Sequence, residues 1–286
     1  MTPTLARQHL PHAGATPLAD RRAHARDWVE IQERMLVPLY EAVYERLEVG
    51  SGTRLLGLGC GAGLALLMAA SRGASVTGVD RGADERLPFA RERLLPGTWD
   101  THTRADTWIV DGSPREAAAA PGAPAYNLVT VFDPIGCAAE AEEGVEEQLT
   151  AATPLAEHGA FVVLAGWGPP ERCSASSVLR IAAKLADPQG DSSSWCPSRR
   201  DDLEEVAQRC GLRPDGSGRV ACPFGYADMG SAVRGMLSTG LFDAAIGATE
   251  QEQVDKELTE ALHPYRRADG TVWMPNVFRY LIARIP

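Results

Sequence analysis

The sequence predicts an α/β protein in which helices cover a mostly parallel sheet. Three observations support this prediction. A strand, a glycine turn and a helix follow one another over residues 53–70, and apolar strands alternate with amphipathic helices as far as residue 212. Two further β-rich segments, 219–224 and 276–284, come late in the chain. Alternating strands and helices are typical of a parallel sheet, and we expect the two late strands to form an antiparallel pair at its edge.

Composition excludes several classes of function. The chain has 286 residues, of which 44% are hydrophobic and 23% charged, enough for one domain with insertions or two small domains. A net charge of -10 without any basic run argues against a nucleic-acid partner, because such partners need their phosphates neutralised. We expect a soluble, cytoplasmic protein without a membrane segment, since no signal-type or membrane-length apolar stretch is present. Six scattered cysteines without a CxxC pair favour neither a disulfide framework nor a metal site.

The first fifty residues are expected to form a helical cap. Residues 1–20 are rich in proline and glycine and should be loosely attached. From Asp20 to Leu47 the apolar residues recur at three- and four-residue spacings, which is typical of amphipathic helices. Pro38 is expected to kink this segment or to separate two helices.

The glycine turn predicts a site for a nucleotide-like cofactor. A strand at 55–58 and a helix at 64–70 enclose three glycines, and a fourth, Gly57, lies in the strand, so backbone N–H groups and a positive helix end meet at one point. The next strand, 74–80, ends in Asp80, which is placed to accept hydrogen bonds from a ribose diol. The turn fits two patterns: G-x-G-x-x-A, typical of dinucleotide sites, when it starts at Gly57, and G-x-G-x-G when it starts at Gly59.

In the second register, the phrase from Leu55 to Gly63 resembles the first motif of class I S-adenosylmethionine-dependent methyltransferases. The resemblance implies a Rossmann-like sheet of seven strands with the last pair antiparallel, N-terminal helices, and a helical lid inserted before the last strand. The late strand pair, which dinucleotide dehydrogenases lack, favours this family. Its members usually carry an acid where Gly57 stands, and that acid orients the methionine end of the cofactor. The departure at Gly57 therefore bears on cofactor affinity.

The resemblance also implies which residues contact the cofactor. Asp111, at the end of a strand over 106–111, takes the place of the acid that binds the adenine amino group, with Asp106 as the alternative. Either aspartate is equally compatible with an ordinary turn. The full predicted cofactor set is Gly57, Gly59, Cys60, Gly61, Gly63, Asp80, Arg81, Asp111, Gly112, Phe132 and Trp28.

Family members carry out their reaction just past the fourth strand, which lies here at 126–135 and is followed by a helix over 140–155. Asp133 is therefore a candidate for substrate contact or proton handling, although an acid before proline is also an ordinary turn. His158 falls in a turn before the fifth strand, 160–165, at the end remote from the site, and is not predicted to be catalytic. Trp167 follows that strand at the binding face.

Residues 225–275 resemble the substrate lid of the family. A helical stretch over 226–265 carries an apolar face with methionines and aromatic residues, which would suit an apolar or aromatic acceptor. Such helices also serve as dimer interfaces, so a homodimer stays open. The predicted substrate-binding residues are Trp167, Tyr226, Met229 and Gln32. The predicted domains are a cap at 1–50, a core at 51–224, a lid at 225–275 and a final core strand at 276–286.

The leading hypothesis is methyl transfer from S-adenosylmethionine to a small-molecule acceptor in secondary metabolism, with S-adenosylhomocysteine as product. Proximity and exclusion of water would provide most of the rate enhancement. Asp133 and His263 are the predicted catalytic residues, and Asp228, Tyr226 and Glu30 are further candidates for a general base. One alternative is a methyltransferase-fold protein that binds the cofactor without methylating. Another is an NAD(P)-dependent oxidoreductase.

Overall fold

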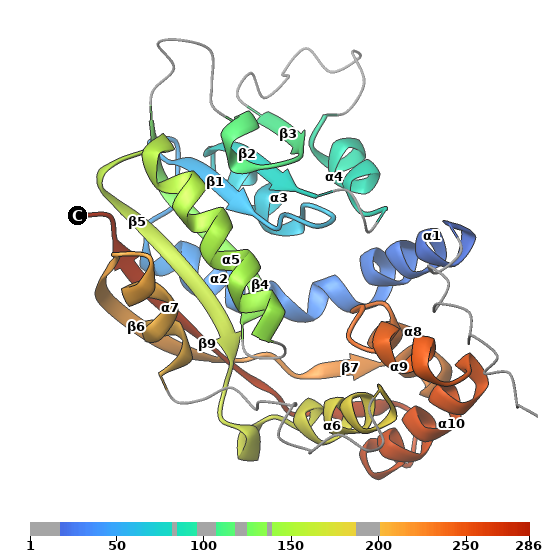
Figure 1. The fold of residues 1–286 in the computed structure, drawn as a ribbon. Helices are drawn as coiled ribbons and strands as arrows, with labels where there is room; N and C mark the ends of the chain where they lie inside the picture. The colour runs from blue at the N-terminus through green and yellow to red at the C-terminus, as the bar shows by residue number, and fades with distance from the viewer. Residues whose placement is uncertain (1–17, 82–84, 96–106, 118–124, 136–138, 187–200) are drawn as a thin grey trace, which may run out of the picture.

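The structure is a computed structural model, and it describes residues 18–81, 85–95, 107–117, 125–135, 139–186 and 201–286. One seven-stranded sheet forms its centre, with strand order β3-β2-β1-β4-β5-β9-β6 (Figure 1). β9 runs antiparallel to both of its neighbours, β5 and β6, while the pairs from β3 to β5 are parallel. The predicted fold class is confirmed. The strands are β1 Arg54–Leu58, β2 Ser75–Asp80, β3 Thr107–Asp111, β4 Tyr126–Ile135, β5 Ala156–Trp167, β6 Arg213–Ala221 and β9 Val277–Arg284.

Helices cover both faces of the sheet, and successive residues of β1 show why. Leu55 packs with Leu39 and Val43 on one face, whereas Leu56 packs with Leu149 and Leu203 on the other. Such strands read as continuous apolar runs because both of their faces are buried. The helices before and around the sheet are α1 Leu18–Asp27, α2 Val37–Arg46, α3 Leu64–Ser71, α4 Leu87–Leu94, α5 Ala139–Ala152, α6 Ala175–Ala186 and α7 Asp202–Arg209.

The N-terminal helical segment changes its winding between α1 and α2. A π-helical turn, Trp28–Gln32, is followed by a 3-10 turn, Glu33–Leu36. Pro38 does not break the segment, because it lies in the first turn of α2, where its missing N–H costs no helical hydrogen bond. π-helical turns are frequent at functional sites, and this one faces the carboxyl ends of the central strands.

The chain between β6 and β9 leaves the main sheet. A two-stranded antiparallel ribbon, β7 Phe224–Tyr226 and β8 Val272–Met274, brackets three helices (Figure 1). We call residues 225–275 the lid. α8 contacts the π-helical turn and α1, and α6 packs against the other two lid helices. The lid helices are α8 Met229–Leu237, α9 Asp243–Ala248 and α10 Gln251–Leu262.

The sixth strand differs from the prediction of a single strand over 219–224. β6 begins earlier, at Arg213, and ends at Ala221, and Phe224 already belongs to the separate ribbon. Pro223 lies between them, and its lack of an N–H prevents a continuous ladder. Short 3-10 turns complete the fold at Pro114–Ala117, Thr153–Leu155, Pro170–Arg172 and His263–Tyr265.

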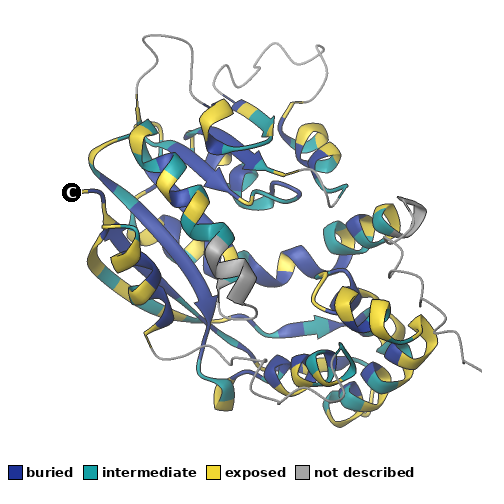
Figure 2. Ribbon diagram, viewed as in Figure 1, coloured by how far each residue is buried: buried dark blue, intermediate teal, exposed yellow. Residues whose placement is uncertain are grey.

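Burial follows this arrangement: the central strands are buried along most of their length, while the outer faces of the lid helices are exposed (Figure 2). Within the ranges given above, no helix has the length and apolar character needed to cross a membrane.

Candidate functional site

The glycine turn after β1 is held in place by the acid at the end of β2. Gly59 and Gly61 adopt left-handed backbone angles, with φ of +61° and +53°, which a residue with a side chain rarely tolerates. The N–H of Gly61 donates to Oδ2 of Asp80 over 2.6 Å. The carboxylate predicted to bind a ribose therefore lies directly against the turn predicted to approach the cofactor.

The space that a side chain at Gly57 would enter is filled by the side chain of Leu66. A Cβ added at this residue would lie 2.8 Å from Cδ2 of Leu66, a residue of α3 that is only 2% exposed. No acidic side chain fits there without moving Leu66. The departure from the family motif at Gly57 is thus matched by the packing around it.

A different carboxylate reaches the glycine turn from the N-terminal segment. Glu33 is only 3% exposed. Its Oε1 accepts a hydrogen bond from the N–H of Leu64, the first residue of α3, over 3.1 Å, and its Oε2 accepts one from Nη1 of Arg93 over 2.5 Å. Arg93 also donates to the carbonyl oxygen of Ala62 over 2.9 Å. An ion pair therefore joins the cap, the turn and α4 at one point.

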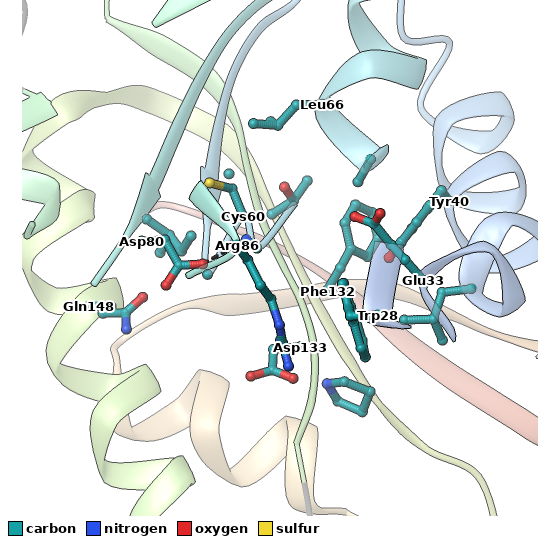
Figure 3. A pocket seen from close by; sticks show the side chains of 18 residues that line it. Trp28, Glu33, Tyr40, Cys60, Leu66, Asp80, Arg86, Phe132, Asp133 and Gln148 are labelled. Atoms are coloured by element: carbon teal, nitrogen blue, oxygen red, sulfur yellow. Dashed lines mark hydrogen bonds between the residues drawn. The ribbon is translucent and has the colours of Figure 1, made fainter. Parts of the chain in front are cut away.

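A first cavity of about 160 Å³ lies on this turn. Figure 3 shows Asp80 and Glu33 on opposite sides of it, with Cys60 between them. Burial, and secondarily the charge of Asp80, raise the pKa of the Cys60 thiol, so this thiol stays neutral. The lining residues are Trp28, Glu33, Leu36, Tyr40, Gly57, Leu58, Gly59, Cys60, Gly61, Ala65, Leu66, Asp80, Arg86, Thr130, Phe132, Asp133, Pro134 and Gln148.

Trp28 contributes a polar atom to this cavity. Its Nε1 is buried and makes no hydrogen bond in the described part of the chain. It points toward the glycine turn, because a Cβ built on Gly61 would lie 4.0 Å from it. Buried donors are nearly always paired, so a ligand acceptor at this position would complete the site.

A second cavity of about 130 Å³ adjoins the first. The two share Trp28, Leu36, Arg86, Asp133 and Pro134, so they lie side by side, and we call them together the cleft. The other residues of the second cavity are mostly apolar or aromatic: Gln32, Trp167, Leu179, Phe224, Met236, Thr239, Leu241 and Phe278. The rings of Trp167 and Phe278 lie 4.6 Å apart, and Phe224 packs edge-on against Trp167.

Asp133 and Arg86 lie where the two cavities meet. Asp133 follows the buried part of β4, at an irregularity in its pairing with β5 between Val131 and Ile135, and such bulges often re-aim side chains beside active sites. The guanidinium of Arg86 stacks 4.3 Å from the Trp28 ring centroid, and its Nη2 donates to the carbonyl oxygen of Ser238 over 2.7 Å. Figure 3 shows the Arg86 side chain extending toward Asp133. Arg86 thus ties the core to the end of α8.

Many of the predicted site residues meet in this cleft. The first cavity gathers Trp28, Gly57, Gly59, Cys60, Gly61, Asp80, Phe132 and Asp133. The second gathers Trp28, Gln32, Trp167 and Asp133.

Several predicted cofactor residues do not line either cavity. Gly63 precedes α3 and packs closely on Ala90, where a Cβ would lie 3.0 Å from the alanine's. Arg81 is exposed and pairs with Glu147. Asp111 and Gly112 end β3 beside Asp80, whose carbonyl oxygen accepts from the N–H of Gly112. Asp106 lies outside the described residues.

The remaining candidates have other surroundings. Tyr226 is buried, and its hydroxyl donates a hydrogen bond to Oε1 of Gln32 over 2.8 Å. Burial raises its pKa, so the hydroxyl stays protonated and is not available as a general base. Met229 begins α8 away from both cavities, and His263 is exposed on the turn after α10. Three further predicted positions carry exposed side chains: Asp228, which caps α8 by accepting from the N–H of Ser231, Glu30, and His158 near the start of β5.

Sequence reasoning missed Glu33, Tyr40, Arg86 and much of the aromatic lining. A signal for Glu33 was present: with Leu36 and Tyr40 it follows the i, i+3, i+7 spacing of one helical face, which places a carboxylate among apolar residues. Among the described residues, no group of three or more His, Cys, Asp or Glu side chains is arranged to hold a metal ion.

Comparison with solved structures agrees with this fold. The chain is similar to an S-adenosylmethionine-dependent methyltransferase of Thiobacillus denitrificans solved with S-adenosylhomocysteine, at 18% identity and a TM-score of 0.51, covering 94% of this chain and 99% of that one. A protein assigned as a methyltransferase from Bacillus halodurans matches at 15% identity and a TM-score of 0.51, covering 86% and 98%. The YjhP protein of E. coli matches at 17% identity and a TM-score of 0.50, covering 92% and 99%.

No protein-family model matches the sequence, and a search of curated proteins returns no match. The structural likenesses are at low identity and concern the fold. The chain has the fold of class I S-adenosylmethionine-dependent methyltransferases, as its sequence predicts.

Proposed function

We propose that the protein transfers a methyl group from S-adenosylmethionine to a small apolar acceptor and releases S-adenosylhomocysteine. One observation carries this proposal: a cavity on the glycine turn, with carboxylates in its lining, adjoins a mostly apolar cavity under the lid, and the two share five lining residues. Group transfer needs donor and acceptor side by side with water excluded. The fold and the presence of S-adenosylhomocysteine in a similar structure support the identity of the donor.

The residues of the first cavity fit this cofactor. Asp80 would accept hydrogen bonds from the ribose hydroxyls, and the glycine turn admits the ligand without a side chain in the way. Trp28 would donate from its unpaired Nε1 to a ligand oxygen. Asp111 and Gly112, next to Asp80 at the sheet end, would take the adenine. When bound, the cofactor supplies an electrophilic methyl carbon attached to a sulfonium.

The protein's own residues align the acceptor and exclude water from the cleft. Trp167, Phe224 and Phe278 hold an apolar acceptor against the residues that the two cavities share, and the contact of Arg86 with Ser238 keeps the lid over the cleft. Asp133 lines both cavities, so we assign to it any proton removal that the acceptor requires. His263 lies too far toward the surface of the lid for this role.

We also propose how the chain is divided into parts and in which kind of metabolism it acts. Residues 1–50 serve as the cap, 51–224 with 276–286 as the cofactor-binding core, and 225–275 as the lid. An apolar, aromatic acceptor cavity fits a reaction of secondary metabolism in the cytoplasm.

A second function keeps the fold and the cofactor but omits methyl transfer. The absence of the usual acid at Gly57 favours it, and the packing of Leu66 against this position means that an acid there would require Leu66 to move. A dinucleotide-dependent oxidoreductase is less well supported, because antiparallel β9 lies inside the sheet between β5 and β6.

Calorimetric titration with S-adenosylmethionine, S-adenosylhomocysteine and NADH separates these functions. We expect both adenosyl ligands to bind and NADH not to bind. S-adenosylhomocysteine release is then followed with a panel of small phenols, aromatic acids and amines. Binding without release for any acceptor would favour the non-methylating function, whereas binding of NADH alone would overturn the proposal.

A further inference from the structure

We propose that Glu33 binds the ammonium group at the amino-acid end of the cofactor, so that the N-terminal segment rather than the sheet recognises this part of the ligand. The inference rests on the proposed function and deepens it, because it assigns a residue and a ligand group to the side of the first cavity opposite Asp80.

Strand β1, which carries the acid in the family motif, provides no negative partner for the ammonium here. The residue at this position of β1 is Gly57, the last but one of the strand, and Leu66 fills the space that a side chain would enter. Two aromatic residues of the same cavity, Tyr40 and Phe132, pack with their ring centroids 4.8 Å apart. A ligand ammonium placed here would need a negative partner from another element.

Glu33 is an acidic residue of the N-terminal segment that reaches this side. It lines the first cavity although it is 3% exposed, and it lies across the cavity from Asp80 (Figure 3). A carboxylate offers about four acceptor positions. The N–H of Leu64 and the guanidinium of Arg93 each take one, so the carboxylate retains capacity toward the cavity.

The surroundings of Glu33 hold its carboxylate in one orientation. Arg93 compensates the buried charge before the ligand arrives, and the N-terminus of α3 adds a second favourable contact. An ammonium entering the cavity would form a charge-assisted hydrogen bond to a carboxylate that is already fixed in position. The ligand class this predicts is an adenosine thioether or sulfonium that carries a primary ammonium on its side chain.

A purely architectural role for Glu33, pinning α3 to the cap, makes a different prediction. Loss of architecture would weaken every ligand of the cavity together. Loss of an ammonium contact would weaken only ligands that have the ammonium. S-adenosylhomocysteine and 5′-methylthioadenosine differ in this way, because the second keeps the adenosine and the sulfur but lacks the amino-acid group.

The test is a calorimetric titration of both ligands into wild-type protein and Glu33→Gln. We expect the substitution to weaken S-adenosylhomocysteine roughly 10-fold or more, and to change 5′-methylthioadenosine by less than about 3-fold, so that the ratio of the two affinities collapses. Glu41→Gln, which alters an exposed acid on the same segment, should leave the ratio unchanged. Equal weakening of both ligands, or no weakening of S-adenosylhomocysteine, would overturn the inference.

Arg93→Gln provides a second variant that removes the ion pair but keeps the carboxylate. We expect it to preserve the wild-type preference for S-adenosylhomocysteine, even if both ligands bind less tightly. Collapse of the preference in this variant would show that the ion pair, not a ligand contact, is what Glu33 supplies. If neither ligand binds the wild-type protein, the proposed function itself fails; if both bind and the ratio survives Glu33→Gln, only this inference fails.

Discussion

The two halves of the cleft are built from different kinds of structure. The first cavity combines the backbone of the glycine turn with the carboxylates of Asp80 and Glu33 on opposite sides, beside apolar and aromatic side chains. The second consists of aromatic and aliphatic side chains from the cap, the late strands and the lid. Charge and hydrogen bonds therefore define one half, and burial defines the other. Substitutions in the first half should alter ligand affinity, whereas those in the second should mainly alter stability.

A substitution at Met236 should give the largest effect and tests this division between affinity and stability. It lines the second cavity at 1% exposure and accepts a contact from the Tyr226 hydroxyl. Met236→Ala should lower the free energy of unfolding by about 2–4 kcal/mol, since it leaves a cavity in the core. Affinity for S-adenosylhomocysteine should change by less than about 3-fold. Urea unfolding and calorimetry measure the two effects, and Met229→Ala, half-buried on the same helix, should cost less than half as much stability.

Asp80→Ala should show the reverse pattern, in which ligand affinity changes more than stability. It removes the acceptor for Gly61 N–H and for the ribose, and hydrogen bonds to charged groups contribute about 1.5–3 kcal/mol. Affinity for S-adenosylhomocysteine should fall roughly 10- to 100-fold in a calorimetric titration. Asp215→Ala, which breaks an exposed ion pair with Arg284, is the matched control and should leave affinity intact. A loss below about 3-fold in Asp80→Ala would contradict the assignment of this carboxylate.

Gly57→Asp tests whether the family's usual acid could work in this chain. The new side chain would collide with Leu66, so we expect a loss of about 1–3 kcal/mol in unfolding free energy and no gain in affinity for S-adenosylhomocysteine. Adding Leu66→Ala removes the obstacle, and the double variant should lose less than the sum of the two single losses in urea unfolding. Tighter ligand binding by Gly57→Asp alone would show that the packing does not exclude an acid.

Trp28→Phe should give the smallest change in ligand affinity, and it tests a residue that lines both cavities. It keeps an aromatic ring for Arg86 to stack on but removes the unpaired Nε1. One neutral hydrogen bond contributes about 0.5–1.5 kcal/mol, so affinity for S-adenosylhomocysteine should fall between about 2- and 12-fold. Trp108→Phe, at a side chain that is 67% exposed, should have no effect. Unchanged affinity in Trp28→Phe would mean that the ligand does not use this donor.

The sheet was predictable because its signals are local. The glycine turn, Asp80 and the late strand at 276–284 can each be recognised from a stretch of about ten residues. The full lining of the apolar cavity was not, because residues such as Leu36, Leu179 and Phe278 meet only after segments far apart in the sequence have packed. Tyr226 and Met229 were expected to bind substrate from their apolar helical pattern, yet periodicity does not distinguish a cavity wall from a core position, and Tyr226 supports Gln32 instead.

The place of β9 in the sheet has a consequence for how the protein is made. On a ribosome, β6 emerges before the lid and the β7–β8 ribbon, and its neighbour in the sheet, β9, emerges after all of them. Until then β6 and the outer side of β5 present open strand edges, which are templates for aggregation. Closing the sheet must therefore be a late step that waits for the whole lid to emerge, and nascent chains that stall inside the lid should be a preferred target for chaperones.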